Sequence, residues 1–255
     1  MSKKFKAIVI DNQNNEFSRK ISELDTTQLK DGNVLVKIDY SGLNYKDALI
    51  LKDGGRIVKN YPFVPGIDFS GVVEESEDNK FKKGDRVILT GFRVGEIYYG
   101  GFSQYAKVNA DFLVKAPNNL TNHQSMMMGT AGLTALLCAF AIKAKEELLL
   151  GEKVKDVLVT GATGGVGSVA VMVLNKMGYT VHAVTGKKDK HDYLKNLGAT
   201  HILDRSEFLG ESKLLEKGIW DGVVDTVGGE ALTKILAQTN IGGIVAQCGN
   251  AGGIK

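Results

Sequence analysis

The first half of the chain alternates hydrophobic and polar positions in short runs. Val34, Val36 and Ile38 alternate with the residues between them, which is the period of two expected of a β-strand. Turn sequences such as Asp31-Gly32 and Gly100-Gly101 separate the runs. Residues 1–122 are therefore expected to form a compact, barrel-like β domain. The predicted strands are Lys6–Ile10, Val34–Tyr40, Asp68–Glu74, Arg86–Thr90, Ser103–Val108 and Phe112–Lys115.

The second half has a different rhythm. A long apolar helix is expected over residues 123–142, and strands then alternate with helices. The predicted strands are Val157–Thr160, Val181–Thr185, His201–Leu203, Val223–Thr226 and Gly243–Gln247. The predicted helices are Val166–Met177, Asp189–Leu197, Ser206–Leu209, Ser212–Lys217 and Glu230–Gln238. Alternating βα units indicate an α/β fold, with a doubly wound parallel sheet over residues 123–255 and helices on both faces.

Composition narrows the class of protein. The 255 residues are 43% hydrophobic and 24% charged, with a formal net charge of +3, as in an ordinary globular protein. Basic residues are scattered, so nucleic-acid binding is not expected. Two cysteines make a disulfide framework implausible and fit the reducing cytoplasm. The uncharged stretch Met126–Ile142 is interpreted as a buried helix, so no membrane partner is expected and the location is predicted to be cytoplasmic.

A glycine-rich turn follows the first strand of the second domain, in the order Val157-Leu158-Val159-Thr160-Gly161-Ala162-Thr163-Gly164-Gly165-Val166-Gly167. In the pattern G-x-G-x-x-G, Ala162 takes the first place, and Gly164 and Gly167 take the other two. Gly164 would let backbone amides approach a pyrophosphate, and Gly167 would let the helix pack close to the strand. The helix N-terminus adds amides and a positive dipole. This strand-turn-helix context predicts a dinucleotide site.

The end of the second strand indicates which dinucleotide binds. An NAD site carries an acidic residue there, which hydrogen-bonds the ribose hydroxyls. Here the strand ends in Thr185-Gly186-Lys187-Lys188, and the first acid is Asp189. A hydroxyl, a glycine and a lysine suit a 2′-phosphate that a carboxylate would repel, so the predicted cofactor is NADPH. The alternative is that these lysines are ordinary solvated side chains.

Several motifs together resemble the medium-chain dehydrogenase/reductase superfamily, and more closely its zinc-free branch of quinone oxidoreductases and acryloyl-CoA reductases. The matching stretches are residues 41–47 (SGLNYKD), 65–71 (PGIDFSG), 84–91 (GDRVILTG), 129–135 (GTAGLTA), the glycine turn and 225–229 (DTVGG). The resemblance implies a GroES-like first domain and a Rossmann-type second domain. It also implies that the segment which completes the second domain in the family is lacking here.

The resemblance also allows a test for zinc. Zinc-dependent members carry a cysteine near the segment Ser41–Asp47 and a Gly-His-Glu sequence where this chain has Gly66-Ile67-Asp68. Neither Ile67 nor the cysteine-free segment supplies such a ligand, and two cysteines are too few for a Cys₄ site. A zinc-independent enzyme with no metal site is therefore expected.

The resemblance implies roles for individual residues. Asn44 and Asp47 would be catalytic: Asn44 would hydrogen-bond the acceptor carbonyl, and Asp47 would order water or deliver a proton. The structural alternative is that both satisfy backbone groups at a strand-to-helix turn. The residues expected to contact the cofactor are Tyr45, Thr163, Gly164, Gly165, Val166, Thr185, Gly186, Lys187, Arg205 and Asn250.

The predicted function is transfer of hydride from NADPH to an α,β-unsaturated carbonyl, with an acryloyl-CoA-type enoyl thioester as the first choice. Without a Lewis acid, the protein would align the reactants and polarise the carbonyl. The first alternative is an NADPH:quinone oxidoreductase acting on a quinone or another enone. The second is a non-catalytic NADPH-binding sensor or a degenerate fragment. A homodimer is a further expectation, and loss of the final strand would leave an open sheet edge and could remove a dimer contact.

Overall fold

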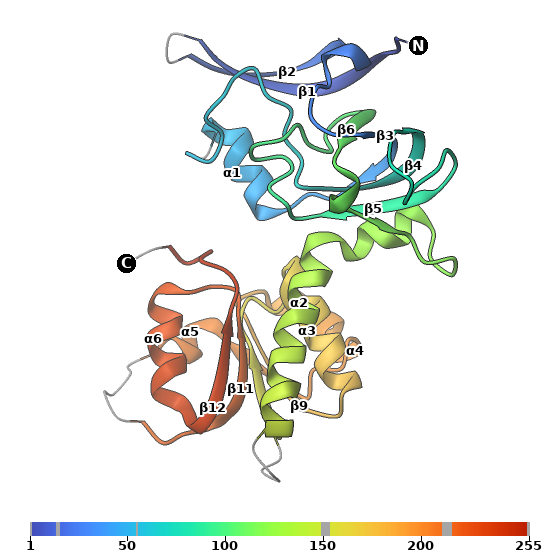
Figure 1. The fold of residues 1–255 in the computed structure, drawn as a ribbon. Helices are drawn as coiled ribbons and strands as arrows, with labels where there is room; N and C mark the ends of the chain where they lie inside the picture. The colour runs from blue at the N-terminus through green and yellow to red at the C-terminus, as the bar shows by residue number, and fades with distance from the viewer. Residues whose placement is uncertain (1, 14–15, 55, 149–153, 211–215, 254–255) are drawn as a thin grey trace. The chain divides into compact units, whose positions relative to one another are not determined.

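The computed structural model describes residues 2–13, 16–54, 56–148, 154–210 and 216–253. The chain divides into two compact units, Met1–Thr130 and Ala131–Lys255. The predicted domain boundary after residue 122 lies at the start of helix α2, Asn122–Leu148, eight positions before the division between the units. Each unit is described separately below (Figure 1).

Unit 1 is built on antiparallel strands. Five of them form one sheet in the order β6-β3-β4-β5-β7, and β1 and β2 form a separate pair. Helix α1, Tyr45–Asp53, follows β3. The strands are β1 Lys4–Gln13, β2 Glu16–Asp25, β3 Val34–Ser41, β4 Asp68–Ser76, β5 Arg86–Thr90, β6 Tyr105–Val108 and β7 Leu113–Lys115. Short 3₁₀ turns are η1 Thr26–Gln28 and η2 Ala110–Phe112.

The alternating strand β3 explains how this unit buries its core. Val34 and Val36 are fully buried and pack in the main cluster of the sheet, with Phe69 and Leu89. Leu35 points to the other face and is also buried, because it belongs to a second cluster under β1. The sheet is therefore covered on both faces at this point, and β3 is more apolar than a strand with one solvated face.

Strand β2 was not predicted from the sequence. It pairs along its full length with β1, from Lys4 opposite Asp25 to Gln13 opposite Glu16. Most of its side chains are exposed or half-buried, and Ile21 is 72% exposed. A strand with little burial on either face has no period-two hydrophobic signal.

Unit 2 contains a parallel sheet in the order β10-β9-β8-β11-β12. All neighbouring pairs are parallel, and the order reverses between β8 and β11, as in the dinucleotide-binding fold. The strands are β8 Asp156–Val159, β9 Thr180–Thr185, β10 His201–Asp204, β11 Trp220–Asp225 and β12 Thr239–Gln247. The predicted α/β fold with a Rossmann-type sheet is confirmed.

Helices cover both faces of this sheet. They are α3 Gly165–Lys176, η3 Lys188–Lys190, α4 His191–Asn196, α5 Arg205–Phe208 and α6 Gly229–Gln238. Helices α2, α3 and α4 pack on one face through Ile142, Leu174 and Leu194, and α5 and α6 pack on the other through Phe208 and Ile235. Figure 1 shows the two groups on opposite sides of the strands. The helix predicted over Ser212–Lys217 falls mainly on residues 211–215, which lie outside the described residues.

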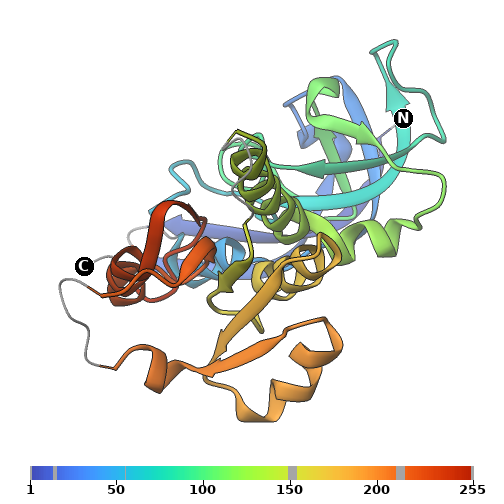
Figure 2. The same cartoon turned by 90° about the horizontal axis from the view of Figure 1, so that it is seen from below.

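Helix α2 has a break near its first third. Gly129 has φ 48° and ψ −153°, which are not helical values. Among the described residues, one helix, Asn122–Lys145, is long and apolar enough to span a membrane by length and composition alone. Its residues Ala135, Ala139 and Ile142 are fully buried against the parallel sheet, which is the packing of a core helix. Figure 2 shows this helix almost along its axis.

Candidate functional site

The glycine turn of unit 2 connects β8 to α3, and its backbone requires glycine at two positions. Gly161 has φ 56°, a conformation that side chains rarely adopt. A Cβ atom on Gly167 would lie 2.3 Å from the carbonyl oxygen of Gly161, so the helix can approach the turn this closely only without a side chain. The N–H of Gly164 donates to the carbonyl of Gly161 at 2.9 Å. The turn is tight, and α3 starts directly after it.

A buried acid that the sequence analysis did not single out holds this turn to the neighbouring strand. Asp225, at the end of β11, is fully buried. Its carboxylate accepts from the Thr160 hydroxyl at 2.5 Å and from the N–H groups of Val227 and Gly228 at 3.0 Å each. The only available signal was an acid closing an apolar strand. The network joins the ends of β8 and β11, on either side of the point where the strand order reverses.

A cavity of about 350 Å³ opens at this point. Its lining follows the carboxyl ends of all five strands of the sheet, where ligands bind in open α/β folds. The lining residues are Thr160, Gly161, Thr163, Val184, Thr185, Gly186, Lys187, Arg205, Phe208, Leu209, Val227, Ala231, Ala251 and Gly252. Five predicted cofactor residues are among them: Thr163, Thr185, Gly186, Lys187 and Arg205.

The charge of this cavity is positive. Lys187 and Arg205 are its charged residues, and no acidic residue is among the described side chains that line it. Asp204, which directly precedes Arg205, is not among the lining residues. Its carboxylate accepts hydrogen bonds from the hydroxyl and N–H of Ser206, and these bonds lower the pKa of Asp204. The cavity therefore lacks the carboxylate that would bond a free ribose hydroxyl and repel a phosphate.

Gly186 has no side chain, and the Arg205 guanidinium therefore lies close to the backbone beside Lys187. A Cβ atom on Gly186 would lie 3.1 Å from Cζ and Nε of Arg205, which is closer than ordinary side-chain contact. The guanidinium is packed against the backbone between Thr185 and Lys187. The Thr185 hydroxyl, in turn, accepts from the Lys187 N–H at 3.1 Å. The group of Thr185, Gly186, Lys187 and Arg205, called the cradle below, carries two cationic side chains and a hydroxyl, which are groups that bind a phosphate by hydrogen bonds.

The other predicted cofactor residues lie elsewhere. Gly164, Gly165 and Val166 form the start of α3 but are not among the cavity's lining residues. Asn250 is exposed, and its side-chain oxygen accepts from Gln247 at 2.9 Å. Tyr45 belongs to unit 1, at the first position of α1, and is 64% exposed. The cofactor-binding roles of all ten predicted residues, in the cavity or outside it, stay predictions.

The predicted catalytic residues Asn44 and Asp47 lie together at the N-terminus of α1. The Asp47 carboxylate accepts from the Asn44 N–H at 2.8 Å and from the Ile67 N–H at 3.0 Å. Asp47 is fully buried. Burial raises the pKa of its carboxyl, although hydrogen bonds from Asn44 and Ile67 act in the opposite direction. Capping of the helix, the structural alternative, is thus part of what this pair does.

A second buried acid, Asp68, fixes the side chain of Asn44. One Asp68 oxygen accepts from Asn44 Nδ2 at 3.0 Å and from the Thr130 N–H at 2.8 Å, and the other accepts from the Gly42 N–H at 2.9 Å. Asp68 is 1% exposed. It also lies against the break in α2, because a Cβ on Gly129 would be 2.9 Å from its carboxylate. In the sequence, Asp68 stands out only as part of the family motif at residues 65–71.

The Asn44 amide has a second N–H besides the one directed at Asp68, since Nδ2 carries two hydrogens. The Asn44 side chain also interacts with the Asp47 carboxylate and lowers its pKa. Asn44 is half-buried, and its hydrogen bond to the Asp68 carboxylate holds the amide in one orientation. Ile67, at the position where zinc-dependent relatives carry histidine, contributes its backbone N–H to Asp47. Within the described residues, no three His, Cys, Asp or Glu side chains are grouped so that they could hold a metal ion.

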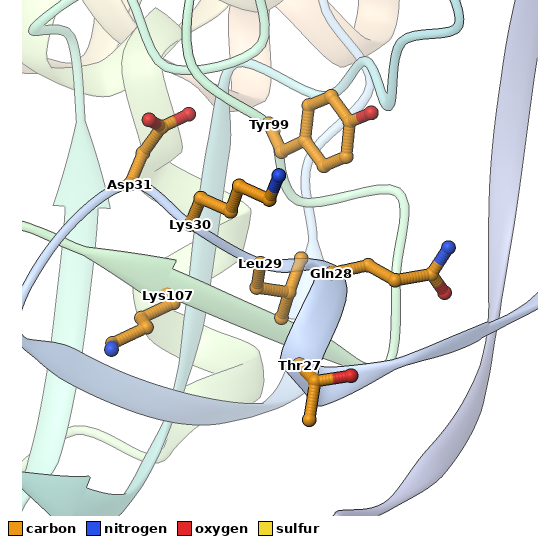
Figure 3. A pocket seen from close by; sticks show the side chains of 7 residues that line it. All are labelled: Thr27, Gln28, Leu29, Lys30, Asp31, Tyr99 and Lys107. Carbon is orange, nitrogen blue, oxygen red and sulfur yellow. The ribbon is translucent and has the colours of Figure 1, made fainter.

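Unit 1 also contains a cavity of about 440 Å³ below the β1–β2 pair, lined by Thr27, Gln28, Leu29, Lys30, Asp31, Tyr99 and Lys107. Figure 3 shows that its charged groups do not converge: the Lys30 amine points toward Tyr99, while the Lys107 amine and the Asp31 carboxylate point away. None of these residues belongs to the network of Asn44, Asp47 and Asp68. No part of the candidate site is assigned to it.

The fold and the cavity define a nicotinamide-dinucleotide oxidoreductase with a GroES-like first unit. In agreement, "Alcohol dehydrogenase GroES-like domain" matches residues 30–118, and "Zinc-binding dehydrogenase" matches residues 165–255. The "Probable acrylyl-CoA reductase AcuI" of Escherichia coli is 47% identical over 247 residues, covering 97% of this chain and 75% of that protein. The "Putative quinone oxidoreductase YhfP" of Bacillus subtilis is 44% identical, covering 99% and 76%.

Solved structures agree with these matches. The yhdH oxidoreductase from Salmonella enterica, in complex with NADP, has a TM-score of 0.91 and 46% identity, covering 97% of this chain and 75% of that one. Bacillus subtilis yhfP, with NAD bound, has a TM-score of 0.90. The chain belongs to the medium-chain dehydrogenase/reductase superfamily, in its branch of acryloyl-CoA reductases and quinone oxidoreductases. It spans about three quarters of the length of these relatives.

Proposed function

We propose that this protein is an NADPH-dependent reductase of α,β-unsaturated carbonyl compounds, with an acryloyl-CoA-type thioester as substrate. The observation that carries the proposal is the cavity of unit 2. Lys187 and Arg205 line it at the ends of β9 and β10, and no acidic residue is among the described side chains that line it. A relative at 47% identity is named a probable acrylyl-CoA reductase, which supports the proposed substrate. A relative at 46% identity was solved in complex with NADP, which supports the proposed cofactor.

Within unit 2, the residues of the cradle would hold the cofactor. Lys187 and Arg205 would bind the 2′-phosphate by charge-assisted hydrogen bonds. Amides of Thr163, Gly165 and Val166 would receive the pyrophosphate at the start of α3, where the helix dipole favours an anion. The Gly164 N–H already donates to the Gly161 carbonyl, so Gly164 would contribute by leaving room for the phosphates. When bound, the nicotinamide supplies the hydride. The yhfP structure was solved with NAD bound, so the phosphate preference needs its own test.

Within unit 1, Asn44 would polarise the acceptor carbonyl through its second N–H, which is a preorganised donor because Asp68 fixes the amide. Asp47 would act by positioning, since both of its carboxylate oxygens hold backbone groups of the turn. Proton delivery by Asp47 stays a prediction. Three basic residues, Arg56, Lys59 and Arg93, are candidate contacts for the phosphates of CoA. Arg56 and Lys59 have exposed side chains, whereas Nε of Arg93 lies 3.5 Å from a carboxylate oxygen of Glu96 and forms an ion pair with it.

The second candidate function is reduction of quinones, which the name of the relative YhfP favours. Steady-state oxidation of NADPH with acryloyl-CoA and with a small benzoquinone separates the two. The proposal expects a kcat/KM for the thioester at least about tenfold above that for the quinone, a difference of about 1.4 kcal/mol in transition-state binding. A preference for the quinone would contradict the substrate, and tight NADPH binding without turnover of either would contradict catalysis.

A cytoplasmic location and a homodimer complete the proposal. The cytoplasm is supported by the two unpaired cysteines. Sedimentation velocity would test the dimer, and a monomer at high concentration would contradict it.

A further inference from the structure

A loop of unit 1, residues 91–98, lies against the segment that holds the candidate catalytic residues. It leaves the sheet at the end of β5, directly opposite Asp68 of β4. Farther along, a Cβ atom on Gly95 would lie 2.5 Å from the Gly66 carbonyl oxygen and 2.9 Å from the Ile67 nitrogen, so the two backbones are in direct contact. Ile67 carries the N–H that holds the candidate catalytic carboxylate. The loop is therefore a wall beside the site in unit 1.

A shared carboxylate ties the same loop to helix α1. Glu96 accepts from the amine of Lys46, in the first turn of α1, at 2.7 Å. Another oxygen of Glu96 lies 3.5 Å from Nε of Arg93. One carboxylate therefore faces two cations, and one positive charge beside the start of α1 is left unbalanced by this group.

Two side chains at the start of the loop sit on strained backbone. Phe92 has φ 51° and Arg93 has φ 62°, values that cost a residue with a side chain free energy and cost glycine none. The Arg93 carbonyl holds this conformation by accepting from the N–H groups of Glu96 at 3.1 Å and Ile97 at 2.9 Å. Phe92 is 54% exposed, and the Arg93 side chain is 61% exposed. Core packing does not account for two strained and exposed side chains, which points to a ligand that contacts them.

The ring of Phe92 is a supported platform. It stacks nearly parallel on the ring of Phe112, with centroids 4.8 Å apart and an angle of 12° between the planes. Phe112 in turn packs against the buried core of the sheet. This support fixes one face of the Phe92 ring, and its exposure leaves the other side open to a flat partner. A platform next to an arginine suits an adenine nucleotide, because a purine stacks on an aromatic ring and a guanidinium binds phosphate.

We propose that Phe92 and Arg93 bind the adenine nucleotide of the CoA group and so select a CoA thioester over smaller acceptors. The inference rests on the proposed function and adds the residues that recognise the part of the substrate remote from the chemistry. Phe92 stacks on the adenine, Arg93 pairs with a phosphate, and the flexible pantetheine arm leads the acyl group to Asn44. An uncharged quinone would gain nothing from the arginine, so the charge favours the nucleotide.

The test compares acryloyl-CoA with acryloyl-pantetheine, which lacks the nucleotide, in steady-state oxidation of NADPH. The variants are Phe92→Gly and Arg93→Gly, because glycine adopts both backbone conformations without strain. Each should lower kcat/KM for acryloyl-CoA at least about fivefold, mainly by raising KM, and change that for acryloyl-pantetheine by less than about twofold. Equal losses with both thioesters, or no loss with acryloyl-CoA, would overturn the proposal. A loss of benzoquinone turnover in Phe92→Gly as large as that of acryloyl-CoA would also overturn it, in favour of the acceptor ring as the occupant.

Conservative variants and a binding measurement complete the test. Phe92→Trp and Arg93→Lys should restore most of the activity with acryloyl-CoA. Lys82→Ala removes an exposed cation before the other end of β5 and should leave all rates unchanged. Calorimetry with free CoA should show binding to the parent that weakens at least about fivefold in both glycine variants, even if no thioester is reduced. Failure of the reductase function would thus leave this result standing, whereas turnover and CoA binding that ignore both residues would overturn this inference alone.

Discussion

Replacement of Lys187 by alanine should weaken NADPH binding selectively. Lys187 lines the cavity at the end of β9 and is solvent-exposed. A hydrogen bond between charged groups contributes about 1.5–3 kcal/mol, and solvent exposure places this one near the lower end. A loss of about 1.5 kcal/mol corresponds to a roughly tenfold higher Kd for NADPH. NADH lacks the 2′-phosphate, so its Kd should change by less than about twofold.

The chain offers a matched control for this variant. Lys188 follows directly in sequence and is also exposed, but it is not among the residues that line the cavity. Lys188→Ala removes the same charge and should leave both dissociation constants nearly unchanged. Lys187→Arg keeps a cation at the site and should restore most of the NADPH affinity.

The assay is titration of the protein with NADPH and NADH by calorimetry or nucleotide fluorescence at two salt concentrations. The NADPH affinity of the parent protein should fall with salt more steeply than that of Lys187→Ala, because ionic strength screens the exposed charge pair. Equal weakening of NADPH and NADH by Lys187→Ala, or an equal effect of Lys188→Ala, would refute the assignment of this lysine to the 2′-phosphate.

Three further variants test other parts of the site and fold. Gly186→Ala should displace the guanidinium packed against it and weaken NADPH but not NADH; titration showing no selective loss would contradict the cradle. Asp68→Asn should lower kcat with little change in KM, because the Asn44 amide loses the carboxylate that fixes it. The same change should lower the free energy of unfolding by about 2 kcal/mol. An unchanged kcat would exclude a positioning role for Asp68. A hydrogen bond from Lys3 is the main reason that the pKa of Glu74 is lowered to about 2 from its usual 4.5. Ionised Glu74 therefore stabilises the fold fully at pH values above 4.5. That stability should be lost as the pH falls toward 2. Glu74→Gln should flatten acid unfolding curves, and identical curves would contradict this.

All five strands of the parallel sheet could be predicted from the sequence, although β11 and β12 begin three and four residues earlier than expected. Strands β8, β9 and β11 are largely buried, so each appears as a short apolar run between turn residues, and β9 ends at Thr185 as expected. The glycine turn was equally visible, because close approach at Gly167 excludes other residues. The exposed strand β2 was not visible, since partial burial leaves no periodic pattern.

The candidate site was only partly accessible from the sequence. Lys187 was predicted from the residues that end its strand and Arg205 through the family resemblance, and the pairing of β9 with β10 brings both into one cavity. The roles of Asp68 and Asp225 could not be predicted, because each accepts hydrogen bonds from segments that are distant in sequence.

Transfer of a label from NADPH tests the central claim most directly. The protein should be incubated with acryloyl-CoA and NADPH that carries deuterium at the transferable position of the nicotinamide C4, and the thioester product analysed by mass spectrometry and NMR. The proposed hydride transfer predicts propionyl-CoA with one deuterium on the carbon β to the carbonyl. Oxidation of NADPH without deuterium in the product, or no propionyl-CoA at all, would contradict it.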